Sequence, residues 1–245
     1  KGKLLRYRHS DLSRLKSLLE KYKHNDLIIM TDGVFSMDGD SAPLIEISKL
    51  CKTYHALLIV DDAHGIGVLG GGGRGLVEEL NLEKEVDLLI GTFGKSFGAI
   101  GAFITGSETI IEAFIQKART YIYTTALLPS VAAAVTHAID LINEGSDLRK
   151  HIKELVVEYK KLARAAGLYV SKSSYHIQPL IIGDANETLR ISKALYKNNI
   201  LVPAIRPPTV PKNTSRLRIS ITAAHTKKDI SLLVKTASNI LNEGQ

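Results

Sequence analysis

A lysine stands among small residues in the segment Gly94-Lys95-Ser96 and could act as a covalent catalyst. Burial and nearby positive charge lower the pKa of a lysine amine, and the free amine can attack a carbonyl carbon. The same triplet occurs in phosphate-binding P-loops, but that motif needs a glycine five residues before Gly94, where this chain has Leu89. The spacing therefore argues against a P-loop. Lys95 is either a covalent catalyst or an exposed lysine of a turn.

Two carboxylates and an imidazole follow an apolar run in the segment Asp61-Asp62-Ala63-His64. A metal ion would need further ligands, and no second histidine or cysteine cluster has a suitable spacing. An aspartate beside the ring nitrogen of an organic cofactor would keep that nitrogen protonated and make the ring a better electron acceptor. The segment therefore indicates an organic cofactor site, or else a hydrogen-bonded strand end without chemistry.

The next residues, 65–70, match the dinucleotide-binding pattern G-x-G-x-x-G. That pattern should open a helix, whereas here four further glycines lie within residues 71–75, a run that disfavours a helix. We therefore predict a flexible loop and not a dinucleotide site.

A proline-rich segment, residues 203–211, carries Arg206 and Thr209. Because proline fixes the backbone φ angle, this segment should hold both side chains in nearly constant positions. Arg218 lies on the polar face of the strand that follows and could bind a carboxylate through two hydrogen bonds. The alternative for either arginine is a role in surface solubility.

The elements that must position these residues alternate between helices and strands. A helix capped by Ser10 is expected first, followed by a second helix over residues 43–54. Apolar strands are expected at residues 27–30, 56–60, 88–93 and 99–105. This pattern predicts an α/β fold with a largely parallel sheet covered on both faces. Ligands bind beyond the carboxyl ends of such strands, where Asp61, His64 and Lys95 fall.

The pattern of the chain changes after two long helices. An alanine-rich helix over residues 129–143 and a charged helix reaching residue 166 precede a strand at 177–182 and a helix at 187–197. Residues 216–222 then alternate between polar and apolar, which predicts a sheet covered on one side. We therefore expect a large domain over residues 1–146 and a small C-terminal α+β domain over residues 147–245.

The amino-acid composition indicates which class of protein this is and which kinds of partner it disfavours. The 245 residues are 44% hydrophobic and 23% charged, with a mean hydropathy of +0.04, as in globular proteins. No apolar run approaches the roughly 18 residues of a membrane-spanning helix. The net charge is +7, but tryptophan is absent and the basic residues are scattered, which favours a basic solvated surface over a nucleic-acid groove. We expect neither a membrane nor a nucleic-acid partner.

The single cysteine, Cys51, excludes an internal disulfide and fits a reducing, cytoplasmic compartment. It keeps helical spacing with Leu44 and Ile47, so we expect a small buried residue and not a nucleophile.

Taken together, four segments closely resemble the α-oxoamine synthases, in the same order over nearly the whole chain. They are GVFSMDGD (33–40), VDDAHG (60–65), TFGK (92–95) and RPPTVP (206–211). These synthases are pyridoxal 5'-phosphate (PLP) enzymes with the aspartate-aminotransferase fold, called fold type I. The resemblance implies that Lys95 holds the cofactor covalently and later acts as acid and base at the substrate α-carbon. Asp61 would pair with the pyridinium nitrogen, and His64 with the phenolic oxygen of the cofactor.

The resemblance also assigns residues to the rim of the cofactor site. Ser36 would line it, and Thr92 would help to bind the phosphate. Thr124 matches a hydroxyl that reaches the phosphate of the neighbouring subunit, which implies a homodimer with shared active sites.

For the substrate, Arg218 would bind the amino-acid carboxylate, while Thr209 and the segment of Arg206 would contact the substrate nearby. The segment of Arg206 most resembles the branch of the family that begins biotin ring assembly. That branch joins L-alanine to a pimeloyl thioester of coenzyme A or of an acyl carrier protein, with loss of carbon dioxide. Two alternatives remain: a sister branch that uses glycine with an acetyl thioester, and a non-catalytic scaffold subunit.

The chain departs from the family before Lys1, where family members carry a stacking aromatic residue and a helix start that binds phosphate. Because the chain also begins without methionine, we expect a piece of a longer protein that binds the cofactor weakly or not at all.

Overall fold

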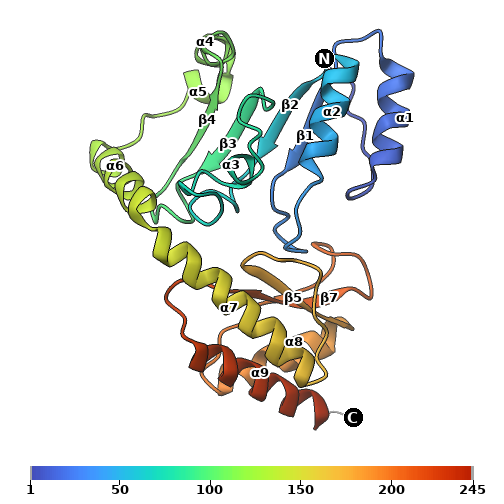
Figure 1. Cartoon of the computed structure of the whole chain (residues 1–245), viewed down its shortest axis with the longest axis vertical. Coiled ribbons are helices and arrows are strands. Elements are labelled where there is room, and N and C mark those ends of the chain that lie inside the picture. The colour runs from blue at the N-terminus through green and yellow to red at the C-terminus, as the bar shows by residue number, and fades with distance from the viewer. Residues whose placement is uncertain (1, 244–245) are drawn as a thin grey trace. The chain divides into compact units, whose positions relative to one another are not determined.

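The computed structural model describes residues 2–243, which form two compact units (Figure 1). The first unit runs up to Val34 and continues over Ser41–Ser146. The second joins Phe35–Asp40 to the residues from Asp147 onward. The later boundary between the units thus lies between Ser146 and Asp147, and a short early segment groups with the second unit. No helix among residues 2–243 is long and apolar enough to cross a membrane.

The first unit is built around a four-stranded sheet. Its strands are β1 (Ile28–Asp32), β2 (Leu57–Asp61), β3 (Leu88–Thr92) and β4 (Ala102–Gly106), in that spatial order. Its helices are α1 (Leu12–Tyr22), α2 (Leu44–Tyr54), α3 (Leu76–Glu79), α4 (Glu108–Lys117), α5 (Arg119–Ile122) and α6 (Pro129–Glu144). The strands β1, β2 and β3 are parallel, whereas β4 runs antiparallel to β3. The prediction of a largely parallel sheet is confirmed.

Coverage of this sheet is less complete than the apolar runs predict. Leu58 and Val60 of β2 are fully buried. In contrast, Ile28 and Met30 of β1 are 60% and 63% exposed, and Leu57 of β2 is also exposed. Successive side chains of a strand point to opposite faces, so one face of these two strands is buried and the other is open to solvent. The prediction of burial on both faces is wrong for β1 and β2.

Two local predictions in this unit have different outcomes. The cap of α1 is Asp11, whose carboxylate accepts a hydrogen bond from the backbone N–H of Arg14, so the prediction of Ser10 is wrong. Ser10 instead lies in the left-handed region, at φ +54°, one residue before the cap.

Cys51 is buried in α2 as predicted, and burial together with the charge of Asp87 raises the pKa of its thiol to about 12. The thiol is therefore protonated at neutral pH and unsuited to nucleophilic attack.

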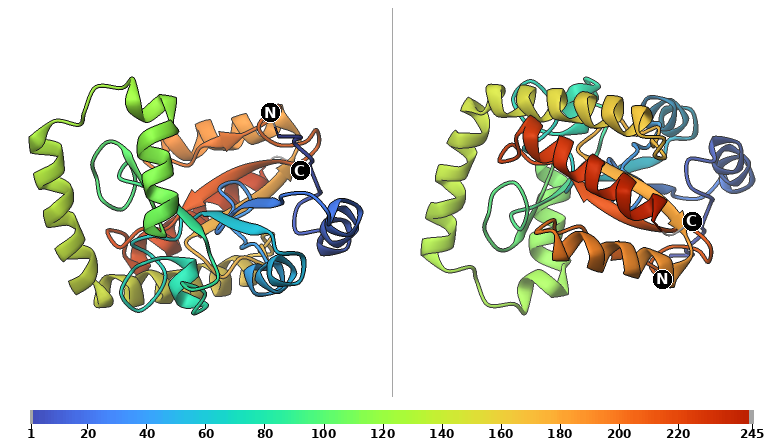
Figure 2. Two further views of the ribbon diagram at one scale, coloured as in Figure 1. Left: turned by 90° about the horizontal axis from the view of Figure 1, so that it is seen from above. Right: turned by 90° about the horizontal axis from the view of Figure 1, so that it is seen from below.

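The second unit is an antiparallel sheet covered by helices. Its elements are α7 (Ser146–Ala165), β5 (Ile177–Gly183), α8 (Ala185–Lys197), β6 (Ala204–Ile205), β7 (Ser215–Ser220) and α9 (Lys227–Asn242), with strand order β5-β7-β6. In the right-hand view of Figure 2, the helices α7, α8 and α9 lie over the same face of this sheet. Their buried side chains, including Tyr159, Ile191 and Val234, form one apolar core with Leu180 and Leu217 of the strands. The predicted α+β arrangement with one covered face is confirmed.

One side chain of β7 breaks the expected alternation. Arg216 was expected on a solvated polar face, but its side chain is only 6% exposed. Its guanidinium forms an ion pair with Asp38 at 2.5 Å, and its Nε donates to the carbonyl oxygen of Thr214 at 3.0 Å. This pair fastens Phe35–Asp40 to β7, which explains why that segment groups with the second unit.

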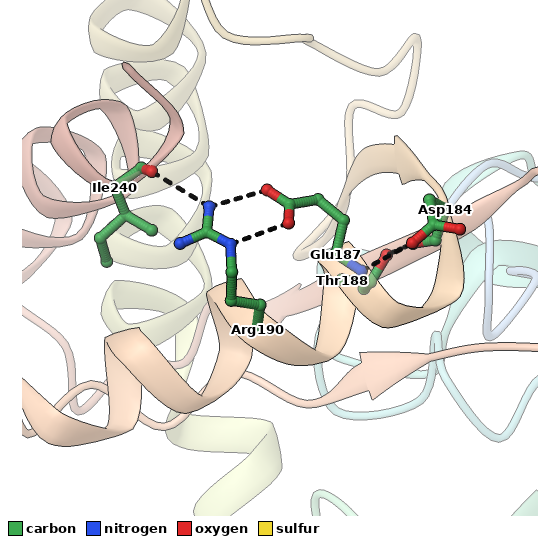
Figure 3. A network of polar contacts seen from close by, with 5 residues as sticks. All are labelled: Asp184, Glu187, Thr188, Arg190 and Ile240. Atoms are coloured by element: carbon green, nitrogen blue, oxygen red, sulfur yellow. Dashed lines mark hydrogen bonds and ion pairs between the residues drawn. The ribbon is translucent and has the colours of Figure 1, made fainter. Parts of the chain in front are cut away.

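The environment of this ion pair predicts its contribution to stability. Replacing Asp38 by alanine leaves the buried Arg216 without its carboxylate, so we expect the free energy of unfolding to fall by roughly 1–3 kcal/mol. The matched control is Glu187→Ala, which removes an exposed pair with Arg190 on α8 (Figure 3). Solvent screens that pair, so the control should change the unfolding free energy very little. Urea unfolding of both variants measures the difference, and equal effects would contradict the structural role of the buried pair.

Candidate active site

Polar residues end the three parallel strands at one edge of the sheet. The strand β1 ends at Asp32, β2 at Asp61 and β3 at Thr92. In the register of the sheet, Asp32 is the direct partner of Asp61, and Asp61 is the partner of Ile90. Because parallel strands end at the same edge, these polar side chains are gathered where α/β folds bind ligands.

Two carboxylates lie side by side at this edge. The side chain of Asp61 accepts a hydrogen bond from the backbone N–H of Ala63 at 3.0 Å. Burial raises the pKa of Asp32 above its ordinary value, and the negative charge of Asp61 raises it further, whereas the positive charge of Lys95 lowers it. Asp61 and Lys95 are thus both within electrostatic reach of Asp32. Asp32 is not among the site residues predicted from the sequence, where its only signal is its place at the end of an apolar run.

The turn of Lys95 is anchored by Thr92. The hydroxyl of Thr92 donates to the carbonyl oxygen of Gly101 at 3.2 Å and accepts from the backbone N–H of Gly94 at 3.1 Å. The backbone N–H of Gly98 donates to the carbonyl oxygen of Lys95 at 3.0 Å. These bonds fix the backbone on both sides of a lysine whose side chain is exposed.

The neighbouring carboxylate of Asp62 is fully buried, unlike that of Asp61. It is 0% exposed, and its Oδ2 accepts a hydrogen bond from the backbone N–H of Leu76 at 2.5 Å. Desolvation raises the pKa of its carboxyl to about 7, and the charge of Asp61 contributes to the rise. Asp62 is therefore an internal anchor, whereas Asp61 and His64 of the same motif are only partly buried.

The second unit brings two other predicted site residues together. The Nε of Arg218 donates to the carbonyl oxygen of Ser36 at 2.5 Å, and its Nη1 donates to the hydroxyl of Ser220 at 2.9 Å. Partial burial lowers the pKa of Arg218 from its ordinary value. A guanidinium has five N–H donors, so these two bonds leave others that can meet a carboxylate.

The remaining predicted residues are exposed. Arg206 and Thr209 lie in one turn, closed by a 3.0 Å hydrogen bond from the backbone N–H of Thr209 to the carbonyl oxygen of Arg206. Thr124 lies just after α5, in an exposed stretch of the first unit. An exposed threonine there is compatible with its expected role toward a second subunit.

Comparison with known proteins identifies the family. Residues 1–236 match the family described as aminotransferase class I and II. The chain belongs to this family. Aminotransferases of classes I and II depend on PLP, and the type I fold predicted from sequence is confirmed.

Similar proteins within this aminotransferase family are 8-amino-7-oxononanoate synthases. The chain is 46% identical to the enzyme of Marinobacter nauticus, over 96% of this chain and 60% of that protein. It is 47% identical to the enzyme of Hahella chejuensis, over 96% of this chain and 59% of that protein. The chain thus spans about 60% of the length of these curated relatives.

Solved structures of aminotransferase-fold enzymes agree. A serine palmitoyltransferase with PLP superposes with a TM-score of 0.93 at 30% identity, over 98% of this chain and 61% of that chain. The 8-amino-7-oxononanoate synthase from Francisella tularensis superposes with a TM-score of 0.86 at 32% identity, over 99% of this chain and 70% of that chain. Two enzymes with different names thus share this fold, so the fold alone does not select a substrate.

Proposed function

We propose that the protein carrying this chain binds PLP at the edge formed by the ends of β1, β2 and β3. The donor set fits such a cofactor, because Lys95 offers an amine for the aldehyde, Asp61 a carboxylate for the ring nitrogen, and His64 an imidazole for the phenolic oxygen. The observation that carries this proposal is geometric: Asp61 is paired with Asp32 at the ends of β2 and β1, and Thr92, which ends β3, anchors the turn of Lys95 at the same edge of the sheet.

When bound, PLP supplies an electron sink for the bonds around the amino-acid α-carbon. The residues of this chain then have separate tasks. Asp61 holds the proton on the ring nitrogen, and Lys95 removes and returns a proton at the substrate α-carbon. Thr92 helps to bind the phosphate, and Ser36 lines the cofactor site.

The substrates we propose are L-alanine and a pimeloyl thioester, carried by coenzyme A or by an acyl carrier protein. The support is the 46–47% identity with 8-amino-7-oxononanoate synthases. Arg218 binds the alanine carboxylate through the N–H donors that Ser36 and Ser220 leave, with Arg206 and Thr209 contacting substrate from the neighbouring turn. A new carbon–carbon bond forms at the thioester carbonyl, and the thiol and carbon dioxide leave. The net charge of +7 suits an anionic carrier.

The proposed assembly is a homodimer, in which Thr124 of each subunit contacts the phosphate bound by its neighbour. The exposed position of Thr124 beyond α5 supports this arrangement.

A substrate comparison tests the proposal. The protein carrying this chain is incubated with PLP, and thiol release is measured for pimeloyl-coenzyme A with L-alanine and for acetyl-coenzyme A with glycine. We expect the first pair to react at least about tenfold faster, because a pocket shaped for a side chain discriminates by this order. Faster reaction of the second pair would support the glycine-using branch. Bound PLP without thiol release from either pair would support a non-catalytic subunit.

A further inference from the structure

The glycine-rich segment 65–75 has no part in the proposed chemistry, yet its conformation is tightly specified. It leaves β2 and folds back on itself before α3 begins, with the N–H of Gly67 bonded to the carbonyl oxygen of Gly73 at 2.7 Å. Several of its residues adopt positive φ angles, which glycine alone adopts without strain. They are Gly67 (+84°), Gly70 (+82°), Gly73 (+76°) and Gly75 (+97°). This segment is therefore a closed loop and not the helix-opening turn of a dinucleotide site.

The base of this loop is fixed by the buried carboxylate of Asp62. Besides the hydrogen bond from Leu76, its two oxygens are enclosed by glycine backbones. A Cβ at Gly33, Gly65 or Gly75 would overlap a carboxylate oxygen of Asp62. No side chain other than hydrogen fits at these three positions, so the loop is held directly to the end of β2.

The upper part of the loop is fixed by a second carboxylate. Oxygens of Glu78 accept hydrogen bonds from the backbone N–H of Gly72 at 3.0 Å and from that of Arg74 at 2.9 Å. Backbone N–H groups of a loop that are satisfied in this way resist local opening.

This fixed loop contacts the turn of Lys95. The hydroxyl of Ser96 donates to the carbonyl oxygen of Ile66 at 2.8 Å. A Cβ at Gly67 would overlap the Cβ of Ser96 and lie 2.5 Å from its Oγ, so Ser96 reaches Ile66 only because Gly67 has no side chain. The residue adjacent to Lys95 is thus held by a hydrogen bond on one side and by close packing on the other.

We propose that the loop 65–75 braces the turn of Lys95, and that Ser96 is the positioning residue through which it does so. Thr92 holds one end of the turn, and the brace holds the other, so the amine of Lys95 starts from a restricted set of positions at the sheet edge. Prior restriction of a reacting group lowers the entropic cost of bringing it to its partner. The expected effect on PLP capture by Lys95 rests on the proposed function. The contact of the loop 65–75 with Ser96 is a property of this chain alone.

The experiment compares two glycine variants with the same kind of backbone strain. Gly67→Ala and Gly167→Ala each place an alanine at a positive φ angle, +84° and +71°. Only the first meets Ser96, since Gly167 lies outside the loop 65–75 and a Cβ there would meet nothing within 4 Å. Amide hydrogen exchange is measured at Gly94, Gly98 and Ala99 without cofactor. PLP is then added, and the rate at which borohydride fixes it to Lys95 is measured by peptide mass.

We expect Gly67→Ala to speed amide exchange in the Lys95 turn by roughly tenfold or more relative to Gly167→Ala, and to slow PLP capture at Lys95. Equal exchange in the two variants would overturn the brace. If Gly67→Ala does not fold, Ser96→Ala serves instead: exchange should rise with the lost hydroxyl and return in Ser96→Thr, and an unchanged turn in Ser96→Ala would also overturn the brace. If the protein that carries the wild-type chain takes up no PLP, the proposed function is contradicted, while the exchange data still decide the brace.

Discussion

Replacing Lys95 by alanine should abolish the covalent capture of PLP and lower turnover by at least roughly a thousandfold, because both attachment and proton transfer depend on this one amine. The structure gives the physical reason. The backbone around Lys95 is held by hydrogen bonds to Thr92 and between Gly98 and Lys95, so the turn itself specifies where this amine starts. Borohydride reduction followed by peptide mass analysis measures capture, and thiol release measures turnover.

The matched control is Lys84→Ala, which removes another exposed amine of the same unit before β3. It should leave PLP capture and turnover unchanged. A borohydride-fixed PLP on a different lysine, or full turnover in Lys95→Ala, would refute the assignment of Lys95.

Much of the first unit could be predicted because its strands are continuous apolar runs. The end of each run also indicated where polar groups would gather, so Asp61 and Lys95 could be expected at one edge of the sheet. The burial of the two sheet faces could not be predicted, because the same runs are compatible with one or two buried faces. Ile28 and Met30 are in fact exposed. Hydrophobicity reports what a side chain favours, whereas its actual burial depends on which elements pack against it.

Long-range pairing explains the remaining misses. Arg216 alternates with apolar residues as a surface residue would, but its carboxylate partner, Asp38, is 178 positions away in the chain. The adjacent carboxylates Asp61 and Asp62 likewise look equivalent in sequence. The groups that enclose Asp62 make the difference, and most of them, such as Gly33, Gly75 and Leu76, lie far from it in the chain. The residues next to the two carboxylates do not reveal these contacts.

This difference between two adjacent carboxylates leads to the second large expected effect. Asp61→Asn should fold normally and lower turnover by roughly a hundredfold to ten-thousandfold, because an amide cannot hold the ring nitrogen in its protonated form. Thiol release and thermal unfolding of the same sample measure the two properties. Unchanged turnover would remove Asp61 from the cofactor site.

Asp62→Asn should instead change the stability of the fold, and the pH dependence of the unfolding free energy should show that titration of Asp62 is the cause. The pKa of Asp62 is raised from its ordinary 3.8 to about 7 in the folded chain, so folding favours the neutral carboxyl. Its contribution to stability is complete below about pH 3.8 and is lost as the pH rises through about 7. Urea unfolding between these pH values should therefore show a smaller loss of stability in Asp62→Asn than in the unmodified chain. Asp61→Asn should keep most of that loss, because removing the charge of Asp61 only weakens one cause of the raised pKa while burial remains. The same pH slope in Asp62→Asn as in the unmodified chain would show that Asp62 is not the group that titrates, and the role of internal anchor would then fail.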